Sequence, residues 1–274
     1  MTERVVAGVP FAVRGDTGGP ALLLLHGFTG TPAAWDEVAA GLPDGALVAA
    51  PWLPGHDGHP GWFCGGGFAE AVEALAGALP GLRPGRWHVA GYSLGGRVAL
   101  GLLVRHAGLF SSAVVIGASA GLRSAVERRA RRQADARWVR MLREEGLERF
   151  LMAWEGLPLF ATQRSLPPGR AAAQRTFRLR HHPLGLARAL EVLGLGEMPD
   201  LWPALSGVRV PVRLVAGELD GKFTGLAREM VAKLPAGRVT IVPGVGHNVV
   251  LEAPEAVAGM LRYQLAAGGM GEVA

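Results

Sequence analysis

The sequence predicts a fold of the α/β class, in which helices cover both faces of a mostly parallel central sheet and one helical segment is inserted. Short apolar runs alternate with stretches of helical spacing through residues 1–121, as expected for parallel strands joined by helices. Residues 122–205 show only helical spacing interrupted by prolines, and the alternation resumes over 206–274. We therefore expect a core formed by the first and last segments and a helical cap, formed by the middle one, over the carboxyl edge of the sheet.

The apolar periodicity also predicts the individual elements in order. An edge hairpin is expected over residues 5–13, and the Gly- and Ala-rich tail after Ala266 is expected to be disordered. Strands are expected at 21–25, 46–50, 87–90, 112–116, 212–216 and 239–242, and helices at 32–42, 68–79, 97–105, 226–234 and 254–266.

The stretch Gly91-Tyr92-Ser93-Leu94-Gly95 is the most informative motif of the chain. It lies between an expected strand and an expected helix, where a G-x-S-x-G motif forms a nucleophile elbow. Glycines flank the serine because so tight a turn leaves no room for larger side chains against the neighbouring strand and helix. Since the chain has 41 glycines and the motif can arise by chance, its meaning depends on whether the later loops carry partners for the serine.

Two later loops carry the partners that a serine triad requires. Asp220 and His247 each come after an expected strand, and the order serine, acid, histidine is that of the α/β-hydrolase fold. A carboxylate on Nδ1 fixes the histidine tautomer and stabilises the imidazolium that forms when the ring takes the serine proton. We assign this role to Asp220, because the nearest rival, Glu218, is expected to belong to the strand end.

A candidate oxyanion hole lies after the first parallel strand, in His26-Gly27-Phe28-Thr29-Gly30. We expect the backbone N–H groups of Phe28 and Leu94 to converge on the oxygen that becomes negative during the reaction. His26 is expected to hold this loop by hydrogen bonds rather than to act as a second base.

Positive charge is concentrated in the expected cap. Residues 122–180 hold 14 arginines and 6 acidic residues, a surplus of +8 in a chain whose net charge is +5. The scarcity of lysine and of aromatic residues argues against a nucleic-acid surface. The surplus is either a solvated helix face or a means of binding a small anionic substrate, since arginine binds carboxylates bidentately. Arg97, one helical turn after Ser93, can reach such a substrate, point to solvent or cap a neighbouring loop.

Other features bear on the compartment and on cofactors. One cysteine, Cys64, excludes an internal disulfide and suits a reducing cytosol. The chain has no apolar run near the ~20 residues that span a bilayer, and its start does not have the pattern of a signal peptide. We expect a cytoplasmic protein without membrane insertion, metal or cofactor, since neither zinc-site spacing nor a phosphate-binding glycine loop is recognisable.

Several stretches between Leu22 and Leu261 together resemble one known family. They are Gly91 to Ala99, the arginine cluster from Glu127 to Asp135 followed by Trp138, Trp154 with Pro158-Leu159-Phe160, Gly217 to Phe223, and Gly246-His247-Asn248 with Glu252 and Pro254. This set is similar to the MenH family, the 2-succinyl-6-hydroxy-2,4-cyclohexadiene-1-carboxylate synthases of the α/β-hydrolase superfamily. Because it includes the cap, the resemblance is more specific than the triad.

The resemblance implies a lyase of menaquinone biosynthesis on a hydrolase scaffold. The family eliminates pyruvate from 2-succinyl-5-enolpyruvyl-6-hydroxy-3-cyclohexene-1-carboxylate. Ser93, deprotonated by His247 with Asp220 orienting the ring, would then remove the proton alpha to the succinyl ketone, and the amides of Phe28 and Leu94 would hold the enolate oxygen.

The resemblance also implies which residues bind the substrate. Arginines would bind carboxylates, and Tyr92 and Trp154 would line the pocket. The implied set is Tyr92, Arg97, Arg131, Trp154 and Arg180, with Arg178 as the alternative to Arg180 because residues 177–183 align either way.

The chain departs from the family at Trp52, which stands where the family usually has an acidic residue. This departure leaves open whether His56 is more than a loop anchor. Trp62 and Phe63 either shield the pocket mouth or pack on the surface.

Two other classes of function fit parts of the sequence. A carboxylesterase or C–C bond hydrolase would use the same triad with Ser93 as covalent nucleophile, but a neutral ester requires no arginine at 97 or 131. A non-enzymatic binding protein on a degenerate hydrolase fold would have no use for an intact set of Ser93, Asp220 and His247.

Overall fold

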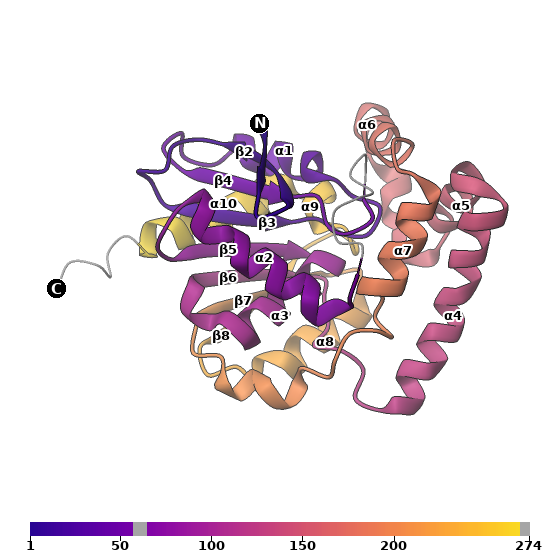
Figure 1. Cartoon of the computed structure of the whole chain (residues 1–274). Helices are drawn as coiled ribbons and strands as arrows, with labels where there is room; N and C mark the ends of the chain where they lie inside the picture. The colour runs from indigo at the N-terminus through magenta and orange to yellow at the C-terminus, as the bar shows by residue number, and fades with distance from the viewer. Residues whose placement is uncertain (57–64, 269–274) are drawn as a thin grey trace.

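The computed structural model describes residues 1–56 and 65–268, and an eight-stranded sheet in the order β1-β2-β4-β3-β5-β6-β7-β8 lies at its centre (Figure 1). Strands β4, β3, β5, β6, β7 and β8 run parallel, and the β1–β2 hairpin joins β4 antiparallel at one edge. The strands are β1 (Thr2–Val6), β2 (Val9–Arg14), β3 (Ala21–Leu25), β4 (Leu47–Pro51), β5 (Trp87–Tyr92), β6 (Phe110–Ile116), β7 (Val212–Gly217) and β8 (Gly237–Val242). The predicted mostly parallel α/β architecture is confirmed.

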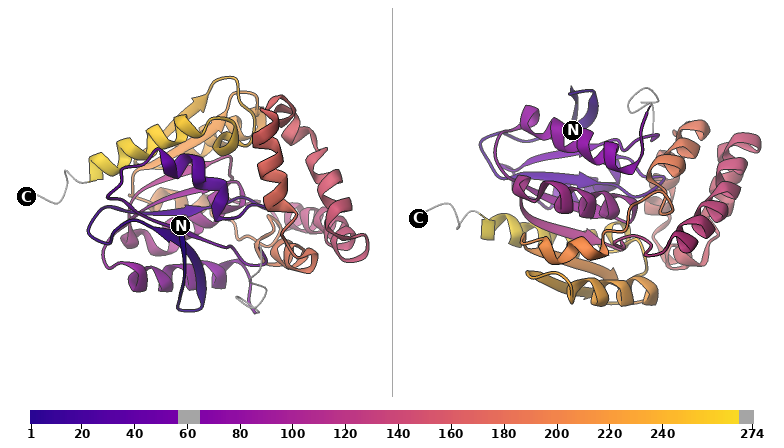
Figure 2. Two further views of the ribbon diagram at one scale, coloured as in Figure 1. Left: turned by 90° about the horizontal axis from the view of Figure 1, so that it is seen from above. Right: turned by 60° about the horizontal axis from the view of Figure 1, so that its bottom comes forward.

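Helices flank the sheet, and a second group lies to one side of it (Figure 2). The flanking helices, with η for a 3-10 helix, are η1 (Pro32–Trp35), α1 (Asp36–Ala40), α2 (Phe68–Leu82), α3 (Leu94–His106), η2 (Ala107–Leu109), α8 (Gly221–Val231), α9 (Val249–Glu252) and α10 (Pro254–Gly268). The helices between β6 and β7 are α4 (Ala125–Glu144), α5 (Gly146–Glu155), η3 (Pro158–Ser165), α6 (Pro168–Arg178), α7 (Pro183–Leu193) and η4 (Trp202–Gly207). None of the helices in the described part of the chain combines the length and apolar character that a bilayer crossing requires.

The continuous apolar run of β3 is explained by burial on both of its faces. Leu23 and Leu25 pack into the cluster that contains residues of α2, α3 and α8, whereas Leu22 and Leu24 pack into the cluster that contains residues of α1 and α10. Successive side chains of a strand point to opposite faces, so a strand covered on both sides is apolar at every position.

The segment 122–205, which we call the cap, has a small core of its own. Its first helix, α4, begins with a capping box, because the Ser124 hydroxyl accepts the Glu127 N–H at 3.1 Å and the Glu127 carboxylate accepts the Ser124 N–H at 2.9 Å. Trp138 and Phe150 pack against α7 residues in this core, and Phe28 of the main body lies against it. The cap therefore contacts the loop that comes after β3.

Several predicted boundaries differ from the structure. The helix expected at 226–234 begins five residues earlier, at Gly221, because the Asp220 carboxylate accepts the Phe223 N–H at 3.2 Å and caps it. The helix expected at 32–42 is a 3-10 turn followed by α1, and α9 was not predicted. Residues 269–274 of the expected disordered tail, and Cys64, Trp62 and Phe63, lie outside the described residues.

The turn between β5 and α3 is held tight by close backbone contacts. Ser93 has φ +52°, a conformation that non-glycine residues seldom adopt. A Cβ at Gly95 would lie 2.1 Å from the Leu25 carbonyl oxygen, and one at Gly91 would lie 2.3 Å from the Gly95 carbonyl oxygen. The flanking glycines therefore permit the contact between this turn and the end of β3.

Gly95→Ala is expected to lower the free energy of unfolding by about 2–3 kcal/mol, because the new methyl group must displace the backbone of β3. Gly77→Ala is the matched control, since Gly77 lies in α2 with open space around its Cα. That change should stabilise the protein by about 0.5–1 kcal/mol through helix propensity. Urea unfolding of the two variants measures both effects, and equal stabilities would show that the contact with β3 is not tight.

Candidate active site

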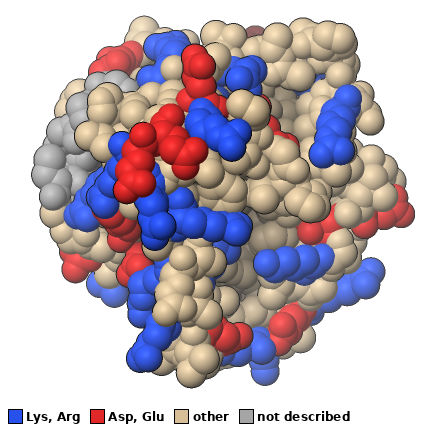
Figure 3. Space-filling model, turned by 90° about the vertical axis from the view of Figure 1, so that its right-hand side faces the viewer, with Lys and Arg blue, Asp and Glu red and all other residues tan. Residues whose placement is uncertain are grey.

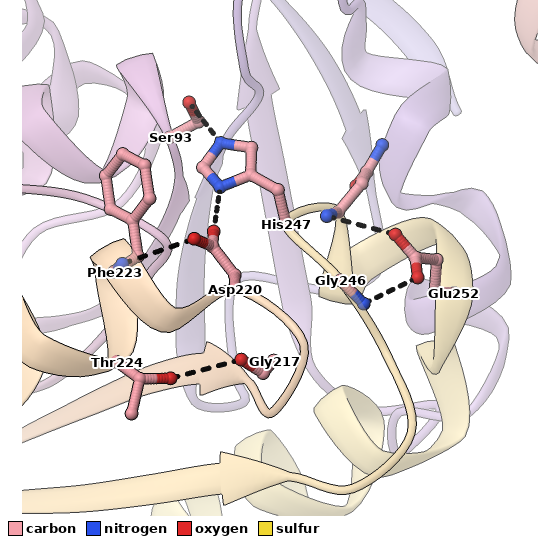
Figure 4. Close-up of polar contacts among 9 residues, drawn as sticks. Ser93, Gly217, Asp220, Phe223, Thr224, Gly246, His247 and Glu252 are labelled. Carbon is pink, nitrogen blue, oxygen red and sulfur yellow. Dashed lines mark hydrogen bonds and ion pairs between the residues drawn. The ribbon is translucent and has the colours of Figure 1, made fainter. Parts of the chain in front are cut away.

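The structure brings Ser93, His247 and Asp220 into one hydrogen-bonded chain (Figure 4). The Ser93 hydroxyl lies 3.1 Å from His247 Nε2, and His247 Nδ1 lies 2.7 Å from an Asp220 carboxylate oxygen. Glu218, the rival acid, lies just past the end of β7 and instead accepts the Gly244 N–H at 2.9 Å. Such a chain lets the histidine remove the serine proton while the carboxylate stabilises the resulting imidazolium.

Asp220 is fixed from the side of α8 as well as by the histidine. Its other carboxylate oxygen accepts the Phe223 N–H, and the Phe223 ring lies 4.5 Å from the His247 ring between centroids. The acid that orients the histidine is thus also the N-cap of a helix, so its position is tied to that helix.

A second carboxylate, that of Glu252, holds the backbone on both sides of His247. It accepts the Gly246 N–H at 2.7 Å (Figure 4). It also accepts the Asn248 N–H at 3.2 Å. Because both amides adjacent to the histidine are bonded to one side chain, Glu252 restricts the loop that carries the ring.

The residues of the expected oxyanion hole lie beside Ser93. Phe28 and Leu94 both line the same pocket as the serine. Leu94 is the first residue of α3, so its N–H has no acceptor within the helix. Among the described residues, neither of these two amides donates to a protein acceptor.

Three buried histidines surround the loop that contains Phe28. His26 donates to the Gly27 carbonyl at 2.8 Å and accepts the Leu53 N–H at 3.1 Å, as expected for a residue that holds the loop. His56 accepts the Thr29 N–H at 3.3 Å. From the cap, His181 donates to the Thr29 carbonyl at 3.0 Å. The loop is therefore anchored from the main body and from the cap.

Burial keeps two of these rings neutral. It lowers the pKa of His26 to about 3 and the pKa of His56 well below its ordinary value, and in both cases the nearby histidines lower it further. A neutral ring keeps one nitrogen as an acceptor, which is what the Leu53 and Thr29 amides require.

A cavity of about 240 Å³ opens in front of Ser93. Five of the residues that the resemblance implies for substrate binding line this cavity. They are Tyr92, Arg97, Arg131, Trp154 and Arg178. Of the two alternatives left open, Arg178 is buried in the pocket wall, 6% exposed, whereas Arg180 is exposed. The reason is that α6 ends at Arg178, so that Arg180 lies beyond the helix face that turns inward.

The pocket is strongly cationic. Its basic side chains are Arg97, Arg131, Arg170, Arg178 and Lys222, and among the described residues that line it Glu37 is the one acidic side chain. Burial, with a smaller contribution from the neighbouring Arg131 charge, lowers the pKa of Arg97 to about 9, so its guanidinium remains charged at neutral pH. Such a site suits an anion rather than a neutral molecule.

Three of the pocket arginines are already paired with carboxylates. Arg131 Nε lies 2.9 Å from Asp135, Arg170 lies 2.7 Å from Glu37, and Arg178 lies 3.0 Å from Glu155; these acids belong to α4, α1 and α5. Elsewhere on the cap side, basic and acidic side chains are interleaved (Figure 3).

Aromatic side chains form the wall of the pocket on the side of the cap. Trp154 stacks on Phe150 at 5.7 Å between ring centroids and meets Phe28 edge-on at 5.2 Å. Its indole N–H is buried and has no protein acceptor among the described residues. Burial raises the pKa of the Tyr92 phenol above its usual range, so this lining residue stays neutral.

Arg170 and Lys222 were not predicted from the sequence to line the site. A signal for Arg170 was present, because Arg170, Gln174 and Arg178 are four residues apart on α6 and all line the pocket. Lys222 is in the Gly217 to Phe223 stretch, directly beside the residues that contact His247, but its spacing alone does not show where its side chain lies.

The triad geometry agrees with the family to which comparison with known proteins assigns the chain. A model of the alpha/beta hydrolase family matches residues 22–260. The 2-succinyl-6-hydroxy-2,4-cyclohexadiene-1-carboxylate synthase of Enterobacter sp. (strain 638) is 34% identical over 247 residues, which are 90% of this chain and 92% of that protein. The chain belongs to the 2-succinyl-6-hydroxy-2,4-cyclohexadiene-1-carboxylate synthase family. It is therefore an enzyme of the α/β-hydrolase superfamily.

Further relatives extend the likeness to the cap. The synthase of Citrobacter koseri (strain ATCC BAA-895 / CDC 4225-83 / SGSC4696) is 33% identical over 89% of this chain and 92% of its own length. Among solved structures, MenH from S. aureus superimposes with a TM-score of 0.87 and 28% identity, over 94% of this chain and 98% of that one. A thermophilic esterase from Thermogutta terrifontis, 24% identical, has a TM-score of 0.80 over 98% and 99% of the two chains. Because this esterase has the same fold, the fold by itself does not distinguish an esterase from a synthase.

The neutral histidines predict a loss of stability in acid. His26 and His56 have a lower pKa in the folded than in the unfolded chain, so below about pH 6.5 the unfolded chain binds more protons. The free energy of unfolding should therefore fall as pH drops from about 6.5 towards 3, by up to about 1.4 kcal/mol per pH unit for each histidine.

Urea unfolding between pH 8 and pH 5 measures this slope. His56→Gln, whose amide can still accept the Thr29 N–H, removes one titrating ring and should give a shallower slope than the wild type. Identical slopes would mean that His56 is not neutral in the folded state.

Proposed function

We propose that this enzyme eliminates pyruvate from 2-succinyl-5-enolpyruvyl-6-hydroxy-3-cyclohexene-1-carboxylate to give 2-succinyl-6-hydroxy-2,4-cyclohexadiene-1-carboxylate, a step of menaquinone biosynthesis. The names of its relatives support this reaction. The observation that carries it is the concentration of five basic side chains around Ser93. The substrate bears three carboxylates that such side chains can bind, whereas a neutral ester offers no charge to pair with them.

Ser93 acts as a base rather than as a covalent nucleophile. His247 takes the hydroxyl proton through the 3.1 Å contact, and Asp220 stabilises the imidazolium that results. The serine oxygen then removes the proton alpha to the succinyl ketone. The amides of Phe28 and Leu94 stabilise the enolate oxygen that develops.

The electron pair released from the C–H bond moves through the enolate into a new ring double bond, and the C–O bond to the enolpyruvyl group breaks. The departing enolate of pyruvate takes up one proton, which balances the proton removed, so no water is consumed. This sequence needs neither an acyl-enzyme nor a cofactor.

The basic side chains hold the substrate so that its acidic C–H bond faces Ser93. Arg97 contacts one carboxylate, and Arg131 and Arg178 contribute the N–H groups that their ion pairs leave available. Residues 122–205 act as the cap over this site and 1–121 with 206–274 as the core. A reaction on a small soluble anion, in a chain with one cysteine, suits the cytoplasm.

Pyruvate release from the enolpyruvyl substrate, followed with lactate dehydrogenase, tests the proposal. The wild type should release pyruvate, and Ser93→Ala should lower kcat by about 10³-fold or more, because the base is removed. Arg97→Ala should raise KM and also lower kcat, by at least about tenfold in kcat/KM, because a charged contact to the substrate is lost.

A panel of p-nitrophenyl esters, assayed with the same proteins, distinguishes the alternative. Serine-dependent ester hydrolysis without pyruvate release would make the protein a carboxylesterase. Unchanged kinetics in Arg97→Ala would remove that residue from the substrate site.

Glu252→Gln should lower kcat about tenfold and change KM less than about twofold, because one of the two acceptors beside His247 becomes a donor and the ring shifts. Glu255→Gln is the matched control, since Glu255 is exposed and lies in the first turn of α10. Pyruvate release at saturating substrate measures both variants. If Glu252→Gln keeps the wild-type kcat, the backbone bonds of Glu252 do not position the histidine.

A further inference from the structure

The five basic side chains of the pocket differ in whether a carboxylate of the protein already pairs with them. Arg131, Arg170 and Arg178 each contact one. In the described part of the chain, no carboxylate lies within ion-pair distance of Arg97 or of Lys222. The positive charge that the protein leaves uncompensated in this pocket is thus located at these two residues.

The two uncompensated cations differ in their surroundings. Arg97 is the more deeply buried, and its guanidinium donates to the Leu193 carbonyl at 2.7 Å. Lys222 is exposed and lies at the start of α8, two residues after Asp220. Its ammonium is 5.5 Å from the Phe223 ring centroid, and the same ring packs against His247. Lys222 is therefore at the mouth of the pocket, on the side of the triad.

We propose that Lys222 is a substrate-binding residue that pairs with a carboxylate of the anionic substrate at the pocket mouth. This inference rests on the proposed function for the identity of the substrate. It adds a lysine to the arginines that are proposed to contact the substrate. Lys222, on the triad side of the site, would contact the part of the substrate nearest to solvent.

The contact with Phe223 does not by itself account for Lys222. A lysine above an aromatic ring at an exposed position gains little from that contact, and the ammonium retains its other hydrogen-bonding capacity. A compact ammonium on a flexible stem can follow a carboxylate as it enters or leaves, whereas a planar guanidinium binds in one orientation. The exposed end of the pocket is where such adaptability is useful.

The charge balance supports the same assignment. A substrate with three carboxylates that entered the pocket would find one unpaired cation at Arg97 and one at Lys222, with the paired arginines as further donors. Without Lys222, a second carboxylate would have to compete with Asp135, Glu37 or Glu155 for a guanidinium that is already occupied. Lys222 removes that competition.

The chain offers a matched control, because Lys222 and Lys233 are its two lysines. Lys233 is exposed near the end of α8 and does not line the pocket. In the pyruvate-release assay, Lys222→Met should raise KM about tenfold with a smaller effect on kcat, and Lys222→Arg should restore most of the affinity. Lys233→Met should behave as the wild type.

Added salt provides a second kinetic readout. KM of the wild type should rise with ionic strength, and the rise should be smaller in Lys222→Met, since one exposed charge pair is missing. A KM for Lys222→Met within twofold of the wild type, or an equal effect of Lys233→Met, would overturn the proposal.

A binding experiment without turnover separates this proposal from the proposed function. Both lysines can be dimethylated reductively with ¹³C-formaldehyde, which keeps their charge, and their NMR signals can be assigned with Lys222→Arg and Lys233→Arg. Titration with succinate, and separately with pyruvate, should shift the Lys222 signal saturably and leave the Lys233 signal in place.

The two assays have distinguishable failures. If the wild type releases no pyruvate while the Lys222 signal still responds to succinate or pyruvate, the proposed reaction is wrong and Lys222 remains an anion-binding residue. If pyruvate is released, and neither KM nor the NMR signal depends on Lys222, the reaction stands and the role of Lys222 is wrong.

Discussion

The close approach of the turn at Ser93 to the end of β3 is the constraint on which the site depends. The backbone at Gly95 packs against the Leu25 carbonyl, so the first turn of α3 lies beside the last residue of β3. The loop that contains Phe28 starts from that same strand end, and Leu94 is the first residue of the helix. One backbone contact therefore constrains Ser93, whose φ is +52°, and the spacing between the two expected oxyanion donors. Larger side chains at this contact would separate them.

The histidine is held by two carboxylates that act on different parts of it. Asp220 contacts the ring nitrogen and is itself the N-cap of α8, whereas Glu252 bonds the amides on either side of the residue. The first fixes which nitrogen carries the proton, and the second fixes where the backbone presents the ring. Asp220 follows β7, and Glu252 ends α9 in the segment that follows β8. The strand order that places β7 beside β8 is therefore a requirement of the site.

The sequence predicted most of the fold because strands buried on both faces are apolar at every position, as β3 is. It also predicted that Asp220 would lie near His247, since both come after parallel strands whose carboxyl ends meet at one edge. It could not decide between Arg178 and Arg180, because that choice depends on where α6 ends and on which face packs inward. The partners of Arg170 and Arg178 were equally inaccessible, since Glu37 and Glu155 are far from them in sequence and no local pattern links them. The pair of Arg131 and Asp135, four residues apart on one helix, is the exception.

The arginine surplus of the cap has two separate explanations, and the structure divides the residues between them. Arg143 and Arg149 pair with acids on the exposed cap surface, where each ion pair contributes little to stability. Arg131 and Arg178 instead face the pocket with a carboxylate already beside each. That pairing limits repulsion among neighbouring guanidinium groups and fixes their planes before a ligand arrives. Selectivity for an anion then depends less on the total positive charge than on how many of the cations the protein leaves without a carboxylate.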